Sequence, residues 1–378
     1  MEPSNPTGRL RAWLREAVGT VRDAVAEPPE AQLPSPVVGG EAAPAEVREA
    51  LGAQALVGDG GLIACWQPVR AELDAAIDAF VAGRPVAVAV VGAAGSGREV
   101  LLDHAERRVR RADAGTLTTR IDAPPAGLLR SELEADLPDV SPRRQAVLVS
   151  GAHRAYRRRI GGFDDLQASL DLLSDTVDRI LWVVEFDAVP WSFLDRVYQV
   201  SAHFSHVLEV PPLSVEDLHL ALQRRLVALA GRARFVFPPP PDLPLEEHPS
   251  WANGGYAARL HLASRGNPQA AGELVWRHLQ PTPAADAFSV HAPPALSLTD
   301  LGAVSPQHVI ALELLLGHSA LNPEDLAELL VLAPSEARSV LEGLVRMGLV
   351  QGDRHRGYAV DPVWRAPLVD HLQSKNLL

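Results

Sequence analysis

The amino-acid sequence predicts an α/β core, in which helices cover both faces of a parallel sheet, followed by a helical section and a small helix-and-hairpin domain. Helical segments such as Glu99–Arg110 alternate with short, mostly apolar runs that have the length of strands. These runs are Val86–Val91, Thr116–Ile121, Ala146–Val149 and Ile180–Val184. Strands that alternate with helices form parallel sheets covered on both sides. After Pro211-Pro212-Leu213 the pattern becomes wholly helical, and this change marks the end of the core.

The composition is that of a globular protein and excludes several classes. The chain has 378 residues, a formal net charge of −12 and a single cysteine, Cys65. One cysteine rules out an internal disulfide framework and thiolate-rich metal sites. The negative charge argues against nonspecific binding of nucleic acid by the whole surface. No apolar run approaches the roughly 20 residues that span a bilayer, so we expect a cytoplasmic protein.

The first 26 residues predict an amphipathic helix. Leu10, Trp13, Leu14, Val18 and Val21 recur three or four residues apart, as on one face of a helix. Residues 27–48, rich in Pro, Glu and Ala, predict a linker. The helix either folds back on its own body or docks on a partner or a membrane surface. The second alternative would give a membrane-associated protein.

The remaining domains follow from composition shifts. The predicted core covers residues 49–212, the helical section 213–280, a proline-bearing linker 281–297 and the last domain 298–378. In the last domain, helices at Pro306–Leu316 and Pro334–Met347 precede two short strands around the turn Gly352–Gly357. Helices followed by a two-stranded wing predict a winged helix-turn-helix, with Pro334–Met347 as its recognition helix.

A glycine-rich loop after the first strand predicts a phosphate-binding site in which the side chains that bind phosphate and Mg²⁺ are replaced. The run Gly92-Ala93-Ala94-Gly95-Ser96-Gly97-Arg98-Glu99 joins a strand to a helix, as the phosphate-binding motif G-x-x-x-x-G-K-[ST] does. The glycines that let backbone N–H groups wrap a phosphate are present. Arg98 replaces the lysine, and Glu99 replaces the hydroxyl residue that holds Mg²⁺. An ordinary strand-to-helix turn is the alternative.

Two further motifs complete a resemblance to the AAA+ and STAND classes of P-loop ATPase. Ala146–Ser150, followed by Gly151-Ala152-His153-Arg154, is similar to their Walker B strand, and Ser264–Gln269 is similar to the turn in their helical lid. The domain order is similar to that of origin-recognition initiators and transposition ATPases. In those families Asp-Glu ends the Walker B strand and serves Mg²⁺ and the attacking water. Ser150 and Gly151 stand there, so the resemblance implies an inactive ATPase.

The resemblance also implies where a degenerate nucleotide site would lie. We expect no resident cofactor, and ATP or ADP binding without hydrolysis is the alternative. The residues that would form the site are Gly92, Gly95, Ser96, Gly97, Arg98, Glu99 and Arg265. Glu185 and Asp187 follow the fourth predicted strand, where the families place a polar sensor residue. Glu99, Glu185 or Asp187 would have to replace the missing acids in a live enzyme.

Arginines outside the loop offer further hypotheses. In AAA+ assemblies an arginine at the position of Arg196 can reach the nucleotide site of a neighbouring subunit, and a surface salt bridge is the alternative. The cluster Arg154, Arg157, Arg158 and Arg159 is either a solvated basic surface or a phosphate contact.

DNA contacts by the winged helix would involve four arginines. These are Arg338 and Arg346 on the recognition helix and Arg354 and Arg356 in the wing. Residues 301–378 contain more acidic than basic side chains, however, whereas a DNA reader normally presents a basic face. We therefore expect the winged helix to bind protein rather than DNA.

The sequence as a whole predicts a catalytically inactive AAA+/STAND-like adaptor or regulatory subunit. Its partner would be another protein, for which an active ATPase relative is a candidate. A winged-helix regulator that binds ATP and DNA with little or no hydrolysis is the main alternative, and a live ATPase that uses displaced acids is a third.

Overall fold

The structure is a computed structural model, and it describes most of the chain. The described residues are 60–113, 115–124, 129–136, 144–229, 233–241, 243–283, 287–294, 304–353 and 357–378, together with 45, 47 and 51. The predicted N-terminal helix (1–26) and most of the predicted linker 27–48 lie outside these residues. No helix among the described residues is long and apolar enough to cross a membrane.

The predicted parallel sheet is confirmed, and it has five strands. The strands are β1 (Ala87–Gly92), β2 (Leu117–Asp122), β3 (Gln145–Ser150), β4 (Ile180–Asp187) and β5 (His206–Glu209). They lie in the order β2-β3-β4-β1-β5, and every neighbouring pair is parallel. After β1 the chain crosses to β2 at one edge of the sheet, and after β4 it crosses to β5 at the other edge. The connections therefore leave the neighbouring strands β1 and β4 in opposite directions, which is where the strand order reverses. In open parallel sheets, ligands bind at the carboxyl ends of the strands at such a point.

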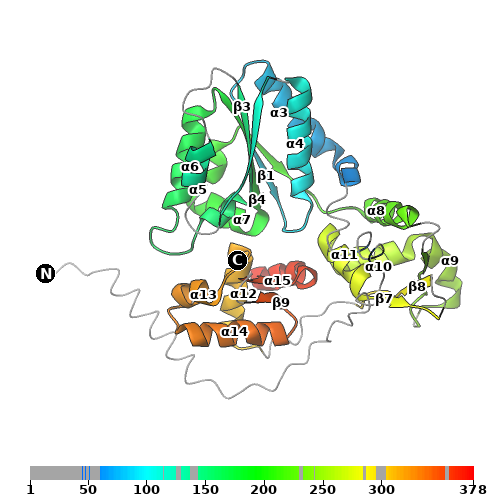
Figure 1. Cartoon of the computed structure of the whole chain (residues 1–378). Coiled ribbons are helices and arrows are strands. Elements are labelled where there is room, and N and C mark those ends of the chain that lie inside the picture. Colours follow the sequence, from blue (N-terminus) through cyan, green and yellow to red (C-terminus); the bar gives the residue numbers. More distant parts are fainter. Residues whose placement is uncertain are drawn as a thin grey trace.

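Helices cover both faces of the sheet (Figure 1). One face packs against α3 (Gln67–Val81) and α4 (Arg98–Ala112). The other packs against α5 (Leu129–Asp136), α6 (Asp164–Thr176) and α7 (Ala188–Tyr198). Successive side chains of a strand point to opposite faces of the sheet, so β1 contributes to the cores on both faces. Val88 and Val90 belong to the first core, and Ala87, Ala89 and Val91 to the second. Every residue of β1 is therefore buried, which explains its uniformly apolar sequence.

The sequence predicted a wholly helical section after the core, but the structure also has strands there. Its main helices are α8 (Val215–Ala228), α10 (Tyr256–Ser264) and α11 (Pro268–Arg277). Shorter helical turns are η5 (Leu245–Glu247), α9 (His248–Ser250) and η6 (Trp251–Gly255). A three-stranded sheet of β6 (Arg234–Val236), β7 (Leu279–Pro281) and β8 (Ala287–Val290) accompanies them. These strands are only three or four residues long, so they leave almost no periodic pattern.

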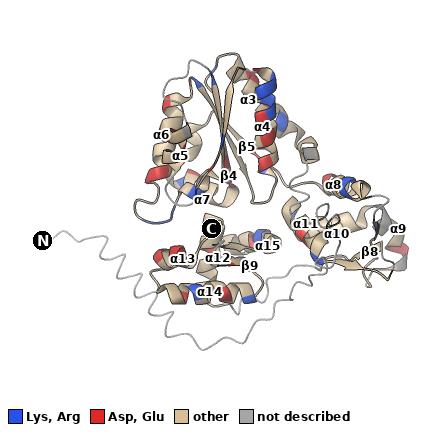
Figure 2. Ribbon diagram, in the orientation of Figure 1, with Lys and Arg blue, Asp and Glu red and all other residues tan. Residues whose placement is uncertain are grey.

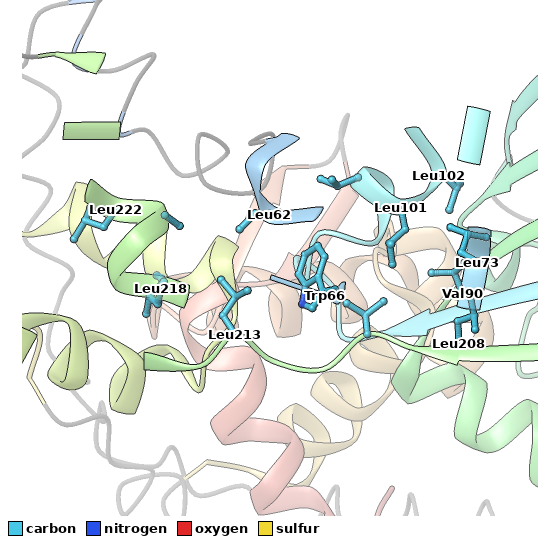
Figure 3. Packing of buried hydrophobic residues seen from close by; sticks show 14 of the residues in the cluster. Leu62, Trp66, Leu73, Val90, Leu101, Leu102, Leu208, Leu213, Leu218 and Leu222 are labelled. Atoms are coloured by element: carbon cyan, nitrogen blue, oxygen red, sulfur yellow. The ribbon is translucent and has the colours of Figure 1, made fainter. Parts of the chain in front are cut away.

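The helices of this section, which we call the lid, share a hydrophobic core with the sheet. Leu213, Leu218 and Leu222 belong to the same buried cluster as Val88 and Val90 (Figure 3). Trp66, which is 2% exposed, lies between the two groups, after the short helix η2 (Gly60–Ala64). The buried leucines of the lid thus continue the cluster on the sheet face that α3 and α4 cover.

The C-terminal module, residues 304–378, has a separate core. Its elements are α12 (Pro306–His318), α13 (Pro323–Leu330), α14 (Pro334–Arg346), β9 (Val350–Asp353), β10 (Gly357–Val360) and α15 (Pro362–Ser374). The two strands form an antiparallel hairpin. The leucines of α12 pack on α14 and on Tyr358 of β10 within a third buried cluster. The module lies beside the carboxyl ends of the sheet strands, next to α7 (Figure 1).

Candidate functional site

Two glycines of the glycine-rich loop adopt left-handed backbone conformations. The loop leaves β1 and enters α4 at the point where the strand order reverses. Gly95 has φ 74° and Gly97 has φ 89°, a region that side-chain-bearing residues rarely adopt. The glycines at these two positions are thus needed for the loop itself, whether or not it binds a phosphate.

Arg98, which replaces the phosphate-binding lysine, points into the sheet. Its Nη1 donates to the carbonyl oxygens of Gly92 at 2.8 Å and Phe186 at 2.5 Å, which lie at the ends of β1 and β4. Its Nη2 forms an ion pair with Glu185 at 3.1 Å. The guanidinium is buried and spans the crevice between the two strands. Its charge is neutralised inside the protein rather than presented to a ligand.

Glu185 is buried in β4, although the sequence placed it after the strand. It is 4% exposed, and this burial raises the pKa of its carboxyl group, an effect that the nearby Arg98 guanidinium opposes. Its Oε2 has no hydrogen-bond partner among the described residues. The ion pair with Arg98 is therefore what compensates for removing this carboxylate from water.

Lid residues pack directly on the loop. The side-chain amide of Asn267 donates to the Ala94 carbonyl at 2.8 Å, and the backbone N–H of Gln269 donates to the Gly95 carbonyl at 3.3 Å. A Cβ atom on Gly95 would lie 2.2 Å from Oε1 of Gln269. The space over Gly95 is thus filled by Gln269, the last residue of the segment that resembles the lid turn.

Trp66 covers the loop at Gly97. A Cβ atom on Gly97 would lie 2.7 Å from Cη2 of the Trp66 ring. The indole N–H of Trp66 donates to the carbonyl of Pro211 at 3.2 Å, so the ring is held between the loop and the start of the lid. With Gln269 over Gly95, both glycines of positive φ are in close contact with large side chains.

Ser150 and Gly151, at the positions where the resemblance places the Walker B acids, lie at the end of β3. Ser150 is the last residue of β3 and is buried. Gly151 has φ 64°, and a Cβ atom there would lie 2.6 Å from Nε of Arg154. A glutamate at this position would be strained and would displace Arg154. Arg154 itself pairs with Asp122 of β2.

The other predicted site residues do not converge on the loop. Glu99 is exposed on α4. Arg265, with φ 55°, ends α10 and lies 3.5 Å from Asp370 of the C-terminal module, with both side chains exposed. Arg196 is exposed in the last turn of α7. Among the described residues, no group of three or more His, Cys, Asp or Glu side chains is placed to hold one metal ion.

Asp187, at the end of β4, joins the core to the C-terminal module. Its side chain is fully buried and forms an ion pair with Arg365 of α15. Burial alone would raise the pKa of Asp187, but Arg365 and then Arg98 hold it below its ordinary value. The backbone N–H of Asp187 donates to Nδ1 of His153 at 3.1 Å. The proton of the neutral imidazole is then on Nε2, which lies 2.8 Å from the hydroxyl of Ser319 in the module.

The basic cluster after β3 also contacts the module. Arg158 pairs with Glu313 of α12, and Arg159 pairs with Glu328 of α13. Arg157, which is buried, lies 3.8 Å from Asp325. The acidic surplus of the module thus faces the basic cluster of the core. Arg158 and Arg159 are about half exposed, so the cluster is partly solvated, as one of the two alternatives predicted, but its charges are paired with the module.

The predicted recognition helix, α14, lies on the side of the module away from the sheet (Figure 1). Arg338 and Arg346 are exposed on it, as are Glu336 and Glu342. Figure 2 shows both signs of charge along this helix. Arg354 and Arg356 lie outside the described residues.

The sequence missed Asp187–Arg365 and Arg98–Glu185 as pairs. Each joins residues far apart in the chain, and the partners in the first pair are 178 residues apart. The sequence did contain a signal for the acidic partner in each pair. Glu185 and Asp187 interrupt an otherwise apolar strand, and buried carboxylates require partners of opposite charge. It did not indicate which of the chain's arginines would serve.

The fold and the loop define an α/β protein of the P-loop NTPase type, with a five-stranded parallel sheet and the glycine-rich loop after β1. No protein-family model matches the chain. No curated protein matches it either.

The chain is similar to solved structures of origin-recognition proteins. One is the ORC2 protein of Aeropyrum pernix, at 14% identity and a TM-score of 0.46, over 82% of this chain and 94% of that one. Another is the ORC1 protein of the same organism in complex with DNA, at 12% identity and a TM-score of 0.46, over 86% and 98%. A third is Cdc6p from Pyrobaculum aerophilum, at 13% identity and a TM-score of 0.40, over 82% and 94%.

Acid is expected to destabilise the junction between core and module. Burial lowers the pKa of both His153 and His318 to about 3. The unfolded chain takes up these protons near pH 6.5, whereas the folded chain does not until about pH 3, so stability falls as the pH drops through this window. At pH 5 each histidine should cost about 2 kcal/mol relative to pH 7.5. Urea unfolding at the two pH values measures the difference.

The variant His318→Phe tests the origin of this acid sensitivity. His318 stacks on Tyr156 with ring centroids 5.5 Å apart, and phenylalanine can keep that contact. The loss of stability between pH 7.5 and pH 5 should be about 2 kcal/mol smaller in this variant. It should persist in His291→Gln, which changes an exposed histidine. An unchanged loss in His318→Phe would contradict the assignment.

Proposed function

We propose that this chain is a catalytically inactive AAA+/STAND-like protein that acts as an adaptor or regulatory subunit through protein contacts. The observation that carries the proposal is the inward orientation of Arg98. A lysine in that position serves the β- and γ-phosphates, whereas this guanidinium binds the carbonyls of Gly92 and Phe186 and the carboxylate of Glu185. The positive charge that a triphosphate needs is already used within the fold.

The surroundings of the loop support the same proposal. Gln269 and Trp66 pack on its two positive-φ glycines, and Gly151 stands in a conformation that disfavours a catalytic glutamate. Of the carboxylates that could replace the missing acids, Glu185 pairs with Arg98 and Asp187 pairs with Arg365. Glu99 is exposed on the first turn of α4, and among the described residues it belongs to no group of three or more His, Cys, Asp or Glu side chains that could hold a metal ion. A live ATPase is thus less well supported than an inactive one.

A calorimetric titration with ATP and Mg²⁺, and with ADP in parallel, tests the proposal. We expect no saturable binding at about millimolar nucleotide, because binding would require Arg98 to leave Glu185 buried without a partner. A control titration with a functional P-loop ATPase verifies the nucleotide and the instrument. Binding with a micromolar dissociation constant would contradict a simple adaptor and would favour the alternative that binds nucleotide with little or no hydrolysis.

A second candidate is a regulator whose C-terminal module, as a winged helix, binds DNA. It is favoured by the exposure of α14, which faces away from the sheet and carries Arg338 and Arg346. Glu336 and Glu342 on the same helix oppose it, since phosphate contacts need a basic surface. Fluorescence anisotropy with a labelled duplex distinguishes the candidates: DNA binding that Arg338→Ala and Arg346→Ala weaken together would favour the regulator.

A further inference from the structure

A cavity of about 560 Å³ lies between α7 and the C-terminal module. One wall comes from α7 of the core and the other from α12 and α15 of the module, which face each other in Figure 1. The volume is in the range of pockets that hold small molecules, and such pockets often form where two domains meet. Neither wall forms a pocket without the other, so the cavity exists only while the module is docked.

Most of the cavity wall is apolar. Val189, Pro190 and Phe193 line it from α7, Leu314 from α12 and Val369 from α15. An apolar wall of this size favours a ligand with a ring or a branched hydrocarbon body, because burying such a body removes apolar surface from water.

The charges around the cavity leave one cation without a partner. Arg158 and Arg365 line the cavity, but they pair with Glu313 and Asp187. Arg196, in the last turn of α7, is exposed and has no ion-pair partner among the described residues. An arginine in this setting can form a charge-assisted, two-pronged contact with a carboxylate or a similar anion. Two carboxylates also line the cavity, but Glu313 pairs with Arg158 and Asp370 lies 3.5 Å from Arg265, so Arg196 is the charged group left for an anionic ligand.

His318 gives the cavity a second polar feature. It is 2% exposed, it lines the cavity from the last turn of α12, and neither of its ring nitrogens has a hydrogen bond of normal geometry, although the backbone of Tyr156 lies close. Buried polar atoms of this kind nearly always have a partner in native proteins. A ligand with a hydroxyl or amide group would supply it.

We infer that this cavity binds a small organic anion, whose apolar body lies between α7 and α15 and whose anionic group pairs with Arg196. A ligand there contacts core and module at once, so its binding stabilises the docked module. Ala93 of the glycine-rich loop and Asn267 of the lid also line the cavity, which thus reaches the edge of the degenerate nucleotide site, but the test below uses no nucleotide and is separate from the ATP titration.

Two matched probes test the inference on the full chain: 2-naphthoate, an aromatic carboxylate, and 2-naphthalenemethanol, a neutral molecule of similar shape. Calorimetry should give one naphthoate site per chain with a dissociation constant of about a millimolar or tighter. The alcohol should bind about tenfold more weakly, since it lacks the charge-assisted contact. Equal affinities, or no binding of either compound at about 10 mM, would overturn the inference.

Three variants test whether the probe binds in the cavity. Arg196→Gln changes an exposed residue and should make the two affinities equal. Ala366→Trp, on α15, should fill the cavity and abolish binding of both. Arg338→Gln, the same change at an exposed arginine of α14, should leave both affinities as they are. Naphthoate binding that is unaffected by Arg196→Gln would show that the probe binds elsewhere.

Discussion

Replacing Arg98 with alanine is expected to lower the free energy of unfolding by about 3–5 kcal/mol. The variant would leave the carboxylate of Glu185, which is 4% exposed, buried without its partner. It would also remove the donor to two strand-end carbonyls, those of Gly92 and Phe186. Urea unfolding at neutral pH measures the loss. An exposed arginine that served only a phosphate would cost far less.

Two further variants separate the ion pair from general damage to the helix. The double variant Arg98→Met with Glu185→Leu removes both charges and keeps most of the volume, so it should recover much of the lost stability. Glu99→Ala, at the next and exposed residue of α4, should change stability by no more than about 0.5 kcal/mol. If Arg98→Ala cost no more than Glu99→Ala, the guanidinium would not be the group that joins β1 to β4.

Replacing Arg365 with methionine is expected to cost about 3–5 kcal/mol as well, and to release the C-terminal module. Asp187 is fully buried, and Arg365 is the cation that pairs with it across the junction. Without this cation the docked state must protonate or expose Asp187. The free energy of undocking therefore falls below the free energy of unfolding. Urea unfolding should then show two transitions in place of one. Small-angle X-ray scattering should show a larger radius of gyration.

Arg159→Ala is the matched control at the same junction. Arg159 pairs with Glu328 of α13, but both side chains are at least half exposed. Exposed ion pairs contribute little, so this variant should lose less than about 1 kcal/mol and keep a single transition. Equal effects of Arg159→Ala and Arg365→Met would indicate that total charge, and not the buried pair, holds the module.

The sequence predicted those elements of the fold that have strong local patterns. The apolar run before Gly92 and the glycines after it predicted β1, the loop and the start of α4, because strand length and positive-φ glycines are local properties. It missed β5, which has four residues, and the three-stranded sheet beside the lid helices. In strands so short, tertiary pairing outweighs the local pattern.

The chemistry of the site was predictable only in part. The substitutions at Arg98, Ser150 and Gly151 were visible in the motif. The orientation of Arg98 was not, because it depends on Glu185, a residue of a different strand. The partners of Arg157, Arg158 and Arg159 lie in α12 and α13 or beside them, more than a hundred residues further along the chain. Such pairings are set by how domains dock, which no local pattern encodes.

Leu213, Leu218 and Leu222 are buried in one cluster with the strands of the sheet. A hinge motion of the lid would expose this apolar surface to water, so the amide protons of α8, α10 and α11 should exchange about as slowly as those of β1. The C-terminal module has its own cluster, but the buried pair Asp187–Arg365 joins it to the core and the buried pair Arg277–Asp361 joins it to the lid. A conformational change in this chain would then involve the Asp187–Arg365 ion pair, and not closure of the lid on a nucleotide.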